Sequence, residues 1–523
     1  MIQSTVSIRV DHCRIHQIEP EQKAAPPAAA DHGSRQFPSE FSIRQSAIAV
    51  RAVFAMKTFL AFALALPILT FAQEKPNIVL VMADDQGWGD MAYNGDPLLK
   101  TPNFDSAAAE GLRFDRFYAA APVCSPTRAS VLTGRHPNRM GVFKWGNTLR
   151  PQEITIAEAL KTAGYATSHF GKWHLGSVRK GSPVSPGASG FDEWLSAPNF
   201  YDNDPILSHR GEAVAIEGES SMVAVDAAID WMRTQVEGET PFLSVVWFGS
   251  PHSPHRAAAE DFELYKDQPE AKAHFLGEIT GMDRAFGKLR SALDEIGIRE
   301  NTILWYCSDN GALGIGNAGE FRGKKGSIYE GGLLVPSILE WPAKIPQPAV
   351  STVRCNTSDI YPTLLDIVGV KVENQTPLDG HSLVPIIGDR QTPDIGRGFW
   401  DFPIDGKGMK AYDMMKEVLD AQAKGEEIPP AADSLKAAEI DPLPPGAEQL
   451  LGHAAWIESD WKLHRIGGKK VGGDVKWELY NLAKDPSETK DLAESEGERV
   501  AAMRRKLEAW MKSVLSSLQG EDY

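Results

Sequence analysis

The sequence has few cysteines and no excess of positive charge. Its 523 residues include four cysteines, Cys13, Cys124, Cys307 and Cys355, too few for a fold held together by disulfide bonds. Its 54 basic residues are outnumbered by 70 acidic residues, and a net charge of -16 excludes a broad electrostatic surface for nucleic acid. The chain is 42% hydrophobic and 24% charged, as globular proteins are. Disorder, collagen and coiled coil are therefore excluded as descriptions of the whole chain.

Long hydrophobic runs are also scarce, and the most prominent one covers residues 59–71. It is too short to span a bilayer comfortably, which takes about 20 apolar residues. It follows Lys57 and ends before the small residue Ala72, a pattern that indicates a secretory signal peptide rather than a buried helix. We therefore interpret residues 56–72 as a signal peptide and expect an exported protein, periplasmic or secreted, with no stable membrane span.

Residues 1–55 precede this signal peptide, which normally stands first in a chain. We therefore interpret them as a mis-assigned upstream extension and take Met56 as the true initiator. Removal of residues 1–72, with their 7 basic and 5 acidic side chains, leaves 451 residues and a net charge of -18.

Short apolar runs alternate with helical patterns in the first part of the remaining chain. The continuous runs 77–83, 242–248 and 302–307 are typical of strands buried on both faces of a parallel sheet. Apolar residues at spacings of three and four predict a long amphipathic helix over 271–296. We therefore predict an α/β catalytic domain over 73–390, with a large, mainly parallel sheet flanked by helices.

The pattern changes after about residue 390. Residues 404–450 are rich in Lys, Glu, Ala and Pro and indicate a partly helical insertion that need not belong to a core. Short strand patterns between residues 453 and 480 precede a predicted helix at 498–518. These features predict a smaller α+β carboxyl-terminal domain over 391–523.

Acidic and amide side chains follow two of the predicted strands directly. Asp84 and Asp85 come after the first strand, and Asp309 and Asn310 come after the third. Ligands of open α/β sheets bind at the carboxyl ends of strands, and oxygen ligands suit a hard cation, Ca²⁺ or Mg²⁺. Either pair alone is weaker support, because acidic residues after strands often cap a following helix.

The most specific motif is the run PVCSPTRASVLTG at residues 122–134. A lone cysteine in an exported chain is usually a buried apolar side chain or half of a disulfide. Here Cys124 stands in a C-x-P-x-R pattern that resembles the activation signature of the type I sulfatases, members of the alkaline phosphatase superfamily. In that family a dedicated enzyme oxidises this cysteine to formylglycine.

Further motifs extend the resemblance, in the family's order, along most of the chain. They lie at residues 164–167 with 171–174, 250–254, 308–311, 325–332 and 479–486. The resemblance implies an alkaline phosphatase-like fold and the hydrolysis of sulfate monoesters of carbohydrates or aryl alcohols. It also implies two partners, a sulfated small molecule or glycan and a formylglycine-generating enzyme. The sequence carries no signal for an oligomeric state.

The resemblance also assigns roles to particular residues. The hydrated aldehyde at position 124 would attack sulfur, and its second hydroxyl would allow sulfate to be released. The implied catalytic residues are Cys124, Arg128, Lys172, His174, His252 and Lys325. The implied ligands of one cation, Ca²⁺ in preference to Mg²⁺, are Asp84, Asp85, Asp309, Asn310 and residue 124.

Positive charge and proton transfer explain why these residue types suit the reaction. Arg128, Lys172 and Lys325 would surround an anionic group with fixed positive charge. His252, with Lys325, would protonate the leaving oxygen, and His174 would hold the second hydroxyl.

Two other functions fit parts of the same pattern. Relatives in the superfamily hydrolyse phosphoesters or phosphonate esters at a similar metal site, and a catalytically inactive member would be a secreted glycan-binding protein. The complete residue set and the single set of metal ligands favour the sulfatase.

Substrate specificity is expected from loops around the site, at 176–215, 252–270 and 404–450. Candidates for stacking on sugar or aryl rings are Trp145, Trp194, Phe200, Tyr201 and Trp400. His255 is a candidate substrate contact. Cys307 and Cys355 either pack as small apolar side chains or form a bond in an oxidising compartment.

Overall fold

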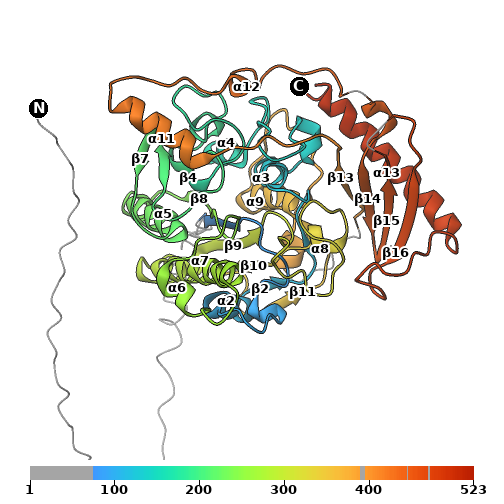
Figure 1. Cartoon of the computed structure of the whole chain (residues 1–523), viewed down its shortest axis with the longest axis horizontal. Helices are drawn as coiled ribbons and strands as arrows, with labels where there is room; N and C mark the ends of the chain where they lie inside the picture. Colours follow the sequence, from blue (N-terminus) through green and yellow to red (C-terminus); the bar gives the residue numbers. More distant parts are fainter. Residues whose placement is uncertain (1–74, 389–394, 445, 469–470) are drawn as a thin grey trace, which may run out of the picture. The chain divides into compact units, whose positions relative to one another are not determined.

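A ten-stranded sheet organises most of the chain (Figure 1). The computed structural model describes residues 75–388, 395–444, 446–468 and 471–523. The interpretation of residues 1–55 as an upstream extension and of residues 56–72 as a signal peptide concerns positions outside the described residues.

The strand order is β11-β2-β10-β9-β1-β8-β4-β5-β6-β7. The five central strands from β9 to β5 are parallel, and antiparallel pairs flank them on both sides. This arrangement confirms the prediction of a large, mainly parallel sheet. The strands are β1 (Asn77–Ala83), β2 (Leu112–Phe114), β4 (Ala166–Lys172), β5 (Glu193–Ala197), β6 (Ile206–His209), β7 (Glu212–Ala215), β8 (Phe242–Trp247), β9 (Thr302–Ser308), β10 (Ser337–Glu340) and β11 (Ala349–Ser351). Strands β3 (Phe117–Tyr118) and β12 (Cys355–Asn356) pair separately.

Helices cover both faces of the sheet, which is why its central strands β1, β8 and β9 are mainly apolar on both faces. On β1, Leu80 and Met82 belong to one hydrophobic cluster, whereas Val79 and Val81 belong to the other, as the two-residue period of a strand requires. The first face is covered by α3 (Cys124–Thr133), α4 (Ile156–Lys161) and α9 (Ile360–Val368). The second face is covered by α2 (Pro102–Glu110), α5 (Ser220–Glu237) and α7 (Glu270–Glu295).

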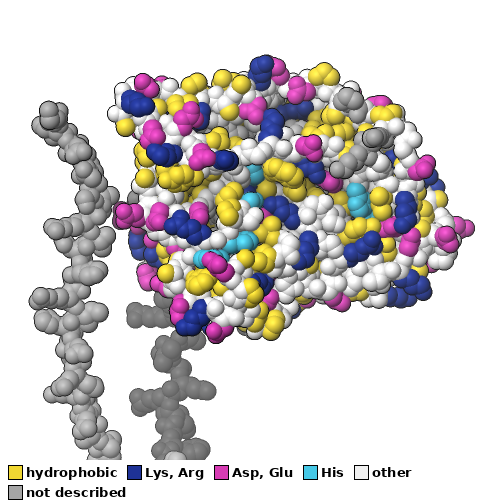
Figure 2. Space-filling model, in the orientation of Figure 1, with side chains coloured by type: hydrophobic (Ala, Val, Ile, Leu, Met, Phe, Trp, Pro, Cys, Tyr) yellow, Lys and Arg dark blue, Asp and Glu magenta, His cyan; other side chains and the backbone are white. Residues whose placement is uncertain are grey.

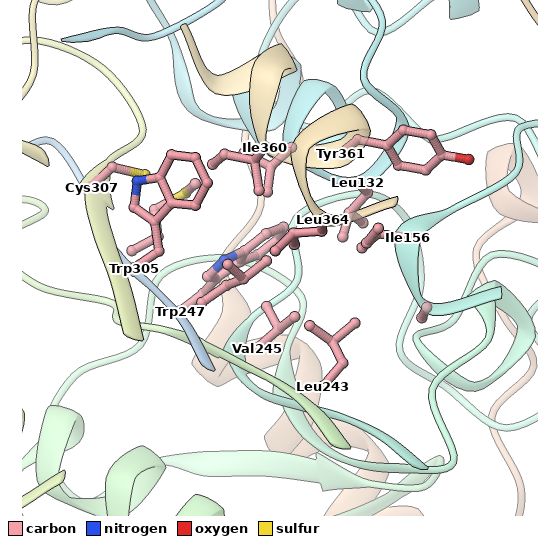
Figure 3. Packing of buried hydrophobic residues seen from close by; sticks show 14 of the residues in the cluster. Leu132, Ile156, Leu243, Val245, Trp247, Trp305, Cys307, Ile360, Tyr361 and Leu364 are labelled. Atoms are coloured by element: carbon pink, nitrogen blue, oxygen red, sulfur yellow. The ribbon is translucent and has the colours of Figure 1, made fainter. Parts of the chain in front are cut away.

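Large aromatic side chains fill the first of these clusters. Trp247 of β8 and Trp305 of β9 pack with Ile360 and Leu364 of α9 (Figure 3). Both indoles are buried, so this face excludes water up to the ends of the central strands. Cys307 lies in the same cluster as a free thiol, and it does not form the bond to Cys355 that the sequence left open.

A separate four-stranded antiparallel sheet forms the carboxyl-terminal part, as predicted. Its order follows the chain, and the long helix α13 (Gly497–Leu518) packs against it (Figure 1). The strands are β13 (Arg397–Asp401), β14 (His453–Glu458), β15 (Trp461–Ile466) and β16 (Lys476–Asn481).

Part of the predicted insertion 404–450 packs into the main core. Helix α11 (Ala411–Gln422) contacts β6 and β7 and buries Met415 and Val418 in the cluster on the first face of the large sheet. The sequence left open whether the insertion joins a core, because both residues become core positions only through this tertiary contact. The remaining helices are α6 (Ala259–Glu263), α8 (Glu330–Leu333), α10 (Val384–Ile387) and α12 (Ala432–Leu435).

None of the described helices combines the length and the apolar composition needed to cross a membrane.

Gly171 marks a close approach of β4 to β8 and gives a test of the fold. Its φ is 100°, and a Cβ there would overlap the carbonyl oxygen of Trp247. Gly164 is a matched control, since its φ is 79° but no described atom lies within 4 Å of its Cβ position. We expect Gly164→Ala to lower the free energy of unfolding by about 1–2 kcal/mol. Gly171→Ala should cost about 1–3 kcal/mol more, because the added methyl overpacks the sheet.

Chemical denaturation of both variants measures this difference. Equal losses in the two variants would contradict the expected overlap.

Candidate active site

The predicted metal ligands meet at the carboxyl edge of the large sheet. Asp84 and Asp85 follow β1, and Asp309 and Asn310 follow β9, which is hydrogen-bonded to β1 along its whole length. Asp85 has a φ of 72°, and its backbone N–H donates to Asp309 Oδ1 at 3.0 Å. All four side chains are buried.

Helix α3 places Cys124 and Arg128 beside the acidic residues Asp84 and Asp309. Cys124 is the first residue of the helix, and Arg128 lies one turn further on the same face. The Cys124 thiol and the carboxylates of Asp84 and Asp309 offer atoms that all lie within 4.8 Å of one another. The Arg128 guanidinium also lies over the Trp247 ring, 5.1 Å from its centroid.

Each of the three carboxylates lies against its own cation. The pairs, with a closest N···O distance of 2.6 Å in each, are Asp84 with Lys172, Asp85 with Lys325, and Asp309 with Arg128. The Arg128 contact is reinforced by a second hydrogen bond from Nε at 3.0 Å. Because water is excluded, each carboxylate depends on its partner far more than a surface ion pair would.

Two buried oxygen atoms in this cluster fit a metal ion. Asp84 Oδ1 and Asn310 Oδ1 find no hydrogen-bond partner among the described residues. The Asn310 amide donates to Asp85 Oδ1 at 2.8 Å, which leaves its own oxygen available. Burial raises the pKa of Asp84 to about 7, although Lys172 opposes the shift. Carboxylate and amide oxygens are the ligands of a hard divalent cation, so these residues fit one.

His252 lies in the loop after β8 and faces Asp85. Its Nδ1 is 2.6 Å from the carbonyl oxygen of Ser253, and since a carbonyl only accepts, Nδ1 carries the proton. Nε2 then faces the site, 3.5 Å from Asp85 Oδ2. The ring stacks on Phe200 with centroids 4.4 Å apart. Burial lowers the pKa of His252 to about 4, with Asp85 opposing the shift.

His174 stands two residues after the end of β4 and has a φ of 57°. Both of its ring nitrogens are buried, and in the described part of the chain neither has a hydrogen-bond partner. Burial holds its pKa well below the ordinary value, and Lys172 and Arg128 act in the same direction. Since leaving such a group unpaired costs about 1–3 kcal/mol, His174 fits a contact with a bound ligand.

The loop that carries Lys325 is fixed by the carboxyl-terminal sheet, which sequence reasoning missed. Five residues after Lys325, buried Glu330 accepts hydrogen bonds from Lys462 Nζ and the Tyr118 hydroxyl, each at 2.8 Å. The Glu330 backbone N–H donates to Glu488 at 2.7 Å. The last predicted motif, 479–486, gave the only hint of this contact, because it lies just before Glu488.

Several predicted substrate contacts are structural instead. Trp194 and Trp400 are buried in hydrophobic clusters, so their prediction as stacking residues was wrong. Tyr201 is also buried. Phe200 is committed to the ring of His252, and Trp145 alone of the five candidates is exposed, at 39%.

His255 also has a structural contact. It bonds to Glu278 at 3.0 Å and packs against Phe275. This arrangement places its ring on α7 rather than toward Asp85.

Residues 76–370 match the family model described as Sulfatase. The chain belongs to the sulfatase family. It is 33% identical to the N-acetylgalactosamine-6-sulfatase of Mus musculus over 358 residues, which are 60% of this chain and 66% of the mouse protein, slightly under two thirds of its length.

Two further comparisons cover a larger share of the other protein. Arylsulfatase A of Homo sapiens is 32% identical over 379 residues, 64% of this chain and 73% of the human protein. The crystal structure of Ps i-CgsB in complex with k-i-k-neocarrahexaose aligns with a TM-score of 0.66 at 25% identity. That alignment covers 84% of this chain and 93% of the other. The predicted resemblance is therefore confirmed at the level of family and fold.

Binding of a divalent ion is the first test of the cluster. We expect Ca²⁺ to stabilise the protein, by about 2.7 kcal/mol at 100 times its Kd. Asp84→Asn should weaken binding at least about tenfold, because a carboxylate ligand is lost. Asp90→Asn is the control. Asp90 lies six residues after Asp84 and is also buried, but its carboxylate accepts hydrogen bonds from the backbone N–H groups of Gly87 and Asn317.

Thermal unfolding across a calcium titration measures both affinities. A parent protein that Ca²⁺ does not stabilise, or an Asp90→Asn variant weakened as much as Asp84→Asn, would contradict the assignment.

Proposed function

We propose that this protein hydrolyses sulfate monoesters, releasing inorganic sulfate and an alcohol. The observation that carries the proposal is Cys124 at the first turn of buried α3, beside three carboxylates and their three cations, in a member of the sulfatase family. The names of the relatives favour a carbohydrate substrate, since one acts on an N-acetylgalactosamine sulfate and another holds a neocarrahexaose.

Two groups complete the proposed site. Conversion of Cys124 to formylglycine by a maturation enzyme would supply a hydrated aldehyde, whose hydroxyl attacks sulfur and whose second hydroxyl permits release. Ca²⁺ held by Asp84, Asp85, Asp309 and Asn310 would supply positive charge to the sulfate oxygens. Ca²⁺ is favoured over Mg²⁺ because a cage of protein oxygens suits its flexible coordination, whereas Mg²⁺ tends to keep several waters.

The protein's own cations hold and orient the sulfate ester. Arg128 and Lys172 are buried on the inner side of the cluster, whereas Lys325 and His252 keep side-chain exposures of 21% and 18%. The ester therefore enters from the side of Lys325 and His252, and the fixed cations meet its oxygens without reorganising.

One atom, His252 Nε2, would donate the proton to the leaving oxygen. The Nδ1 proton is committed to the carbonyl of Ser253, so Nε2 is the ring nitrogen that can exchange a proton with substrate. Asp85 lies beside Nε2 and would stabilise a proton there.

A sulfatase accounts for the ligands better than a phosphoesterase with two metal ions. Within the described ranges, the two candidate ligand groups share Asp84 and belong to one cluster, in which each of the three carboxylates has its own side-chain cation. One divalent ion together with these fixed cations suits a sulfate monoester, which carries a single negative charge. The predicted export is part of the same proposal: the signal peptide at 56–72 would deliver the enzyme to the periplasm or the medium.

Side-by-side rates test the function directly. Protein from a host with a sulfatase-maturing enzyme should hydrolyse an aryl sulfate much faster than aryl phosphate or phosphonate esters. Cys124→Ala should abolish turnover while leaving far-ultraviolet circular dichroism unchanged, because the nucleophile is lost and the small side chain fits the same site.

Mass spectrometry of the tryptic peptide spanning residues 117–128 separates the alternatives. An aldehyde at position 124 with sulfate ester turnover supports the proposal. A preference for a phosphorus ester would support the phosphoesterase, and an unmodified thiol without turnover would support a glycan-binding protein.

The role of His252 predicts a dependence on the leaving group. His252→Ala should slow hydrolysis of a sugar sulfate by about 10²–10⁴-fold, because an alkoxide needs a proton to leave. It should slow 4-nitrophenyl sulfate far less, because nitrophenolate leaves without one. His255→Ala is the matched control and should change neither rate, since its ring is held by Glu278 away from the site. Equal losses on both substrates in His252→Ala would refute the proton-transfer role.

A further inference from the structure

Trp145 lies beside the nucleophile's helix with its side chain partly exposed. The residue after it, Gly146, donates its backbone N–H to Ser125 Oγ at 3.0 Å, and Ser125 follows Cys124. The backbone of Trp145 is therefore tied to the first turn of α3. Trp145 as a residue is 39% exposed, whereas the other aromatic candidates around the site are buried or stacked.

One face of this indole is covered and its orientation is fixed. A Cβ on Gly406 would overlap Cε2 of the Trp145 ring and lie 2.5 Å from both Cδ2 and Nε1. A point so close to three adjacent ring atoms lies over the ring rather than at its edge, so the Gly406 backbone packs on that face. The backbone N–H of Lys407 also donates to the Trp145 carbonyl at 2.9 Å. The exposed area of the Trp145 ring therefore belongs to its other face and its edge.

The same stretch of chain reaches the opposite side of the site. Asn199 donates its amide to the Met409 carbonyl at 2.9 Å, and the next residue, Phe200, stacks on His252. We name residues 404–410 the rim segment. It runs from Trp145, next to the nucleophile, to Phe200, next to the group that faces the leaving oxygen.

The rim segment also carries positive charge. The Lys407 and Lys410 side chains are 55% and 87% exposed, and each has an acidic partner, Asp433 and Asp413, at 3.0 and 4.0 Å. Exposed pairs of this kind contribute little energy, so both lysines remain able to turn toward an anionic ligand. An aromatic ring with nearby cations suits a sulfated sugar better than an uncharged apolar ligand.

We propose that Trp145, backed by Gly406 of the rim segment, is a stacking platform for a sugar ring of a sulfated carbohydrate whose scissile sulfate lies at Cys124. The proposal rests on the proposed function and specifies its substrate class. An indole fixed on one face and open on the other binds the C–H face of a sugar ring without first losing conformational freedom. The rigid backing therefore favours carbohydrate over small aryl sulfates of similar charge.

Kinetics with an inhibitor that lacks a ring distinguish an effect on the Trp145 platform from an effect on the catalytic cluster. The substrates are N-acetylgalactosamine 6-sulfate and a neocarrahexaose, and the inhibitor is inorganic sulfate, which occupies the catalytic cluster but has no ring. Trp145→Ala should raise KM for the better sulfated sugar at least about tenfold, the equivalent of 1.4 kcal/mol, and leave the Ki of inorganic sulfate unchanged. Trp145→Phe should recover most of the loss.

The control variant is Tyr412→Ala, which removes another exposed aromatic side chain, 58% exposed, from α11 in the same insertion. It should change neither KM nor Ki. An unchanged KM in Trp145→Ala would overturn the proposal. A parallel rise of KM and Ki would do the same, because it would place the effect in the catalytic cluster.

Calorimetry in the Cys124→Ala background separates this proposal from the proposed function. This variant should bind neocarrahexaose more tightly than the double variant Cys124→Ala/Trp145→Ala, whether or not the parent turns it over. A parent without sulfatase activity that still shows this difference would refute the function and retain the platform. Equal affinities in an active enzyme would refute the platform alone.

Discussion

Burial of three carboxylates at one edge of the large sheet is the constraint that orders the rest of the site. Like charges so close together, without water, repel strongly unless each meets a cation. The chain supplies these cations from three separate elements: Arg128 from α3, Lys172 from the end of β4, and Lys325 from a loop after β9. The charges that would hold an anionic substrate are thus the charges that allow the carboxylates to be buried at all.

The carboxyl-terminal sheet follows from the same constraint, because the loop that carries Lys325 needs an anchor. Its anchor is Glu330, whose carboxylate meets Lys462 of β15 inside the protein. Lys462 also lies 3.2 Å from Glu488, and Glu488 accepts the backbone N–H of Glu330 and lies 2.6 Å from His464 Nε2, so one lysine holds both carboxylates with help from neighbouring groups. A buried ion pair of this kind adds little net stability, but breaking it is costly, which makes it suited to fixing one position of a loop. The second sheet therefore bears directly on the position of Lys325, the proposed catalytic charge on this loop.

The sequence predicted the elements that have a clear local pattern of apolar residues. It missed the features that depend on contacts between residues far apart in the chain. Strands β1, β8 and β9 have continuous apolar runs, and the acidic residues after β1 and β9 mark their ends. Strand β4 was not recognised because its buried side chains include the polar residues Ser168 and His169, which bond to Ser244 and Ser196 on neighbouring strands. The orientation of His252 by Phe200 has no local signal, because the two rings are brought together only by the loops that follow β5 and β8.

For an acidic protein to bind the proposed anionic ester, the electrostatic field at the site must differ in sign from the net charge of the whole chain. Charged side chains of both signs are interspersed over the face drawn in Figure 2, so the excess of acid is not gathered into one repelling patch there. At physiological ionic strength, exposed charges more than about 8 Å apart are largely screened. The groups that an entering ester meets first are Lys325 and His252, the most exposed members of the cluster. Over the whole cluster, Lys325 included, three carboxylates and three cations balance, so a bound divalent ion would make the cluster positive. The net charge of -16 therefore acts weakly on the approaching ester, whereas the cations of the site act on it at contact distance.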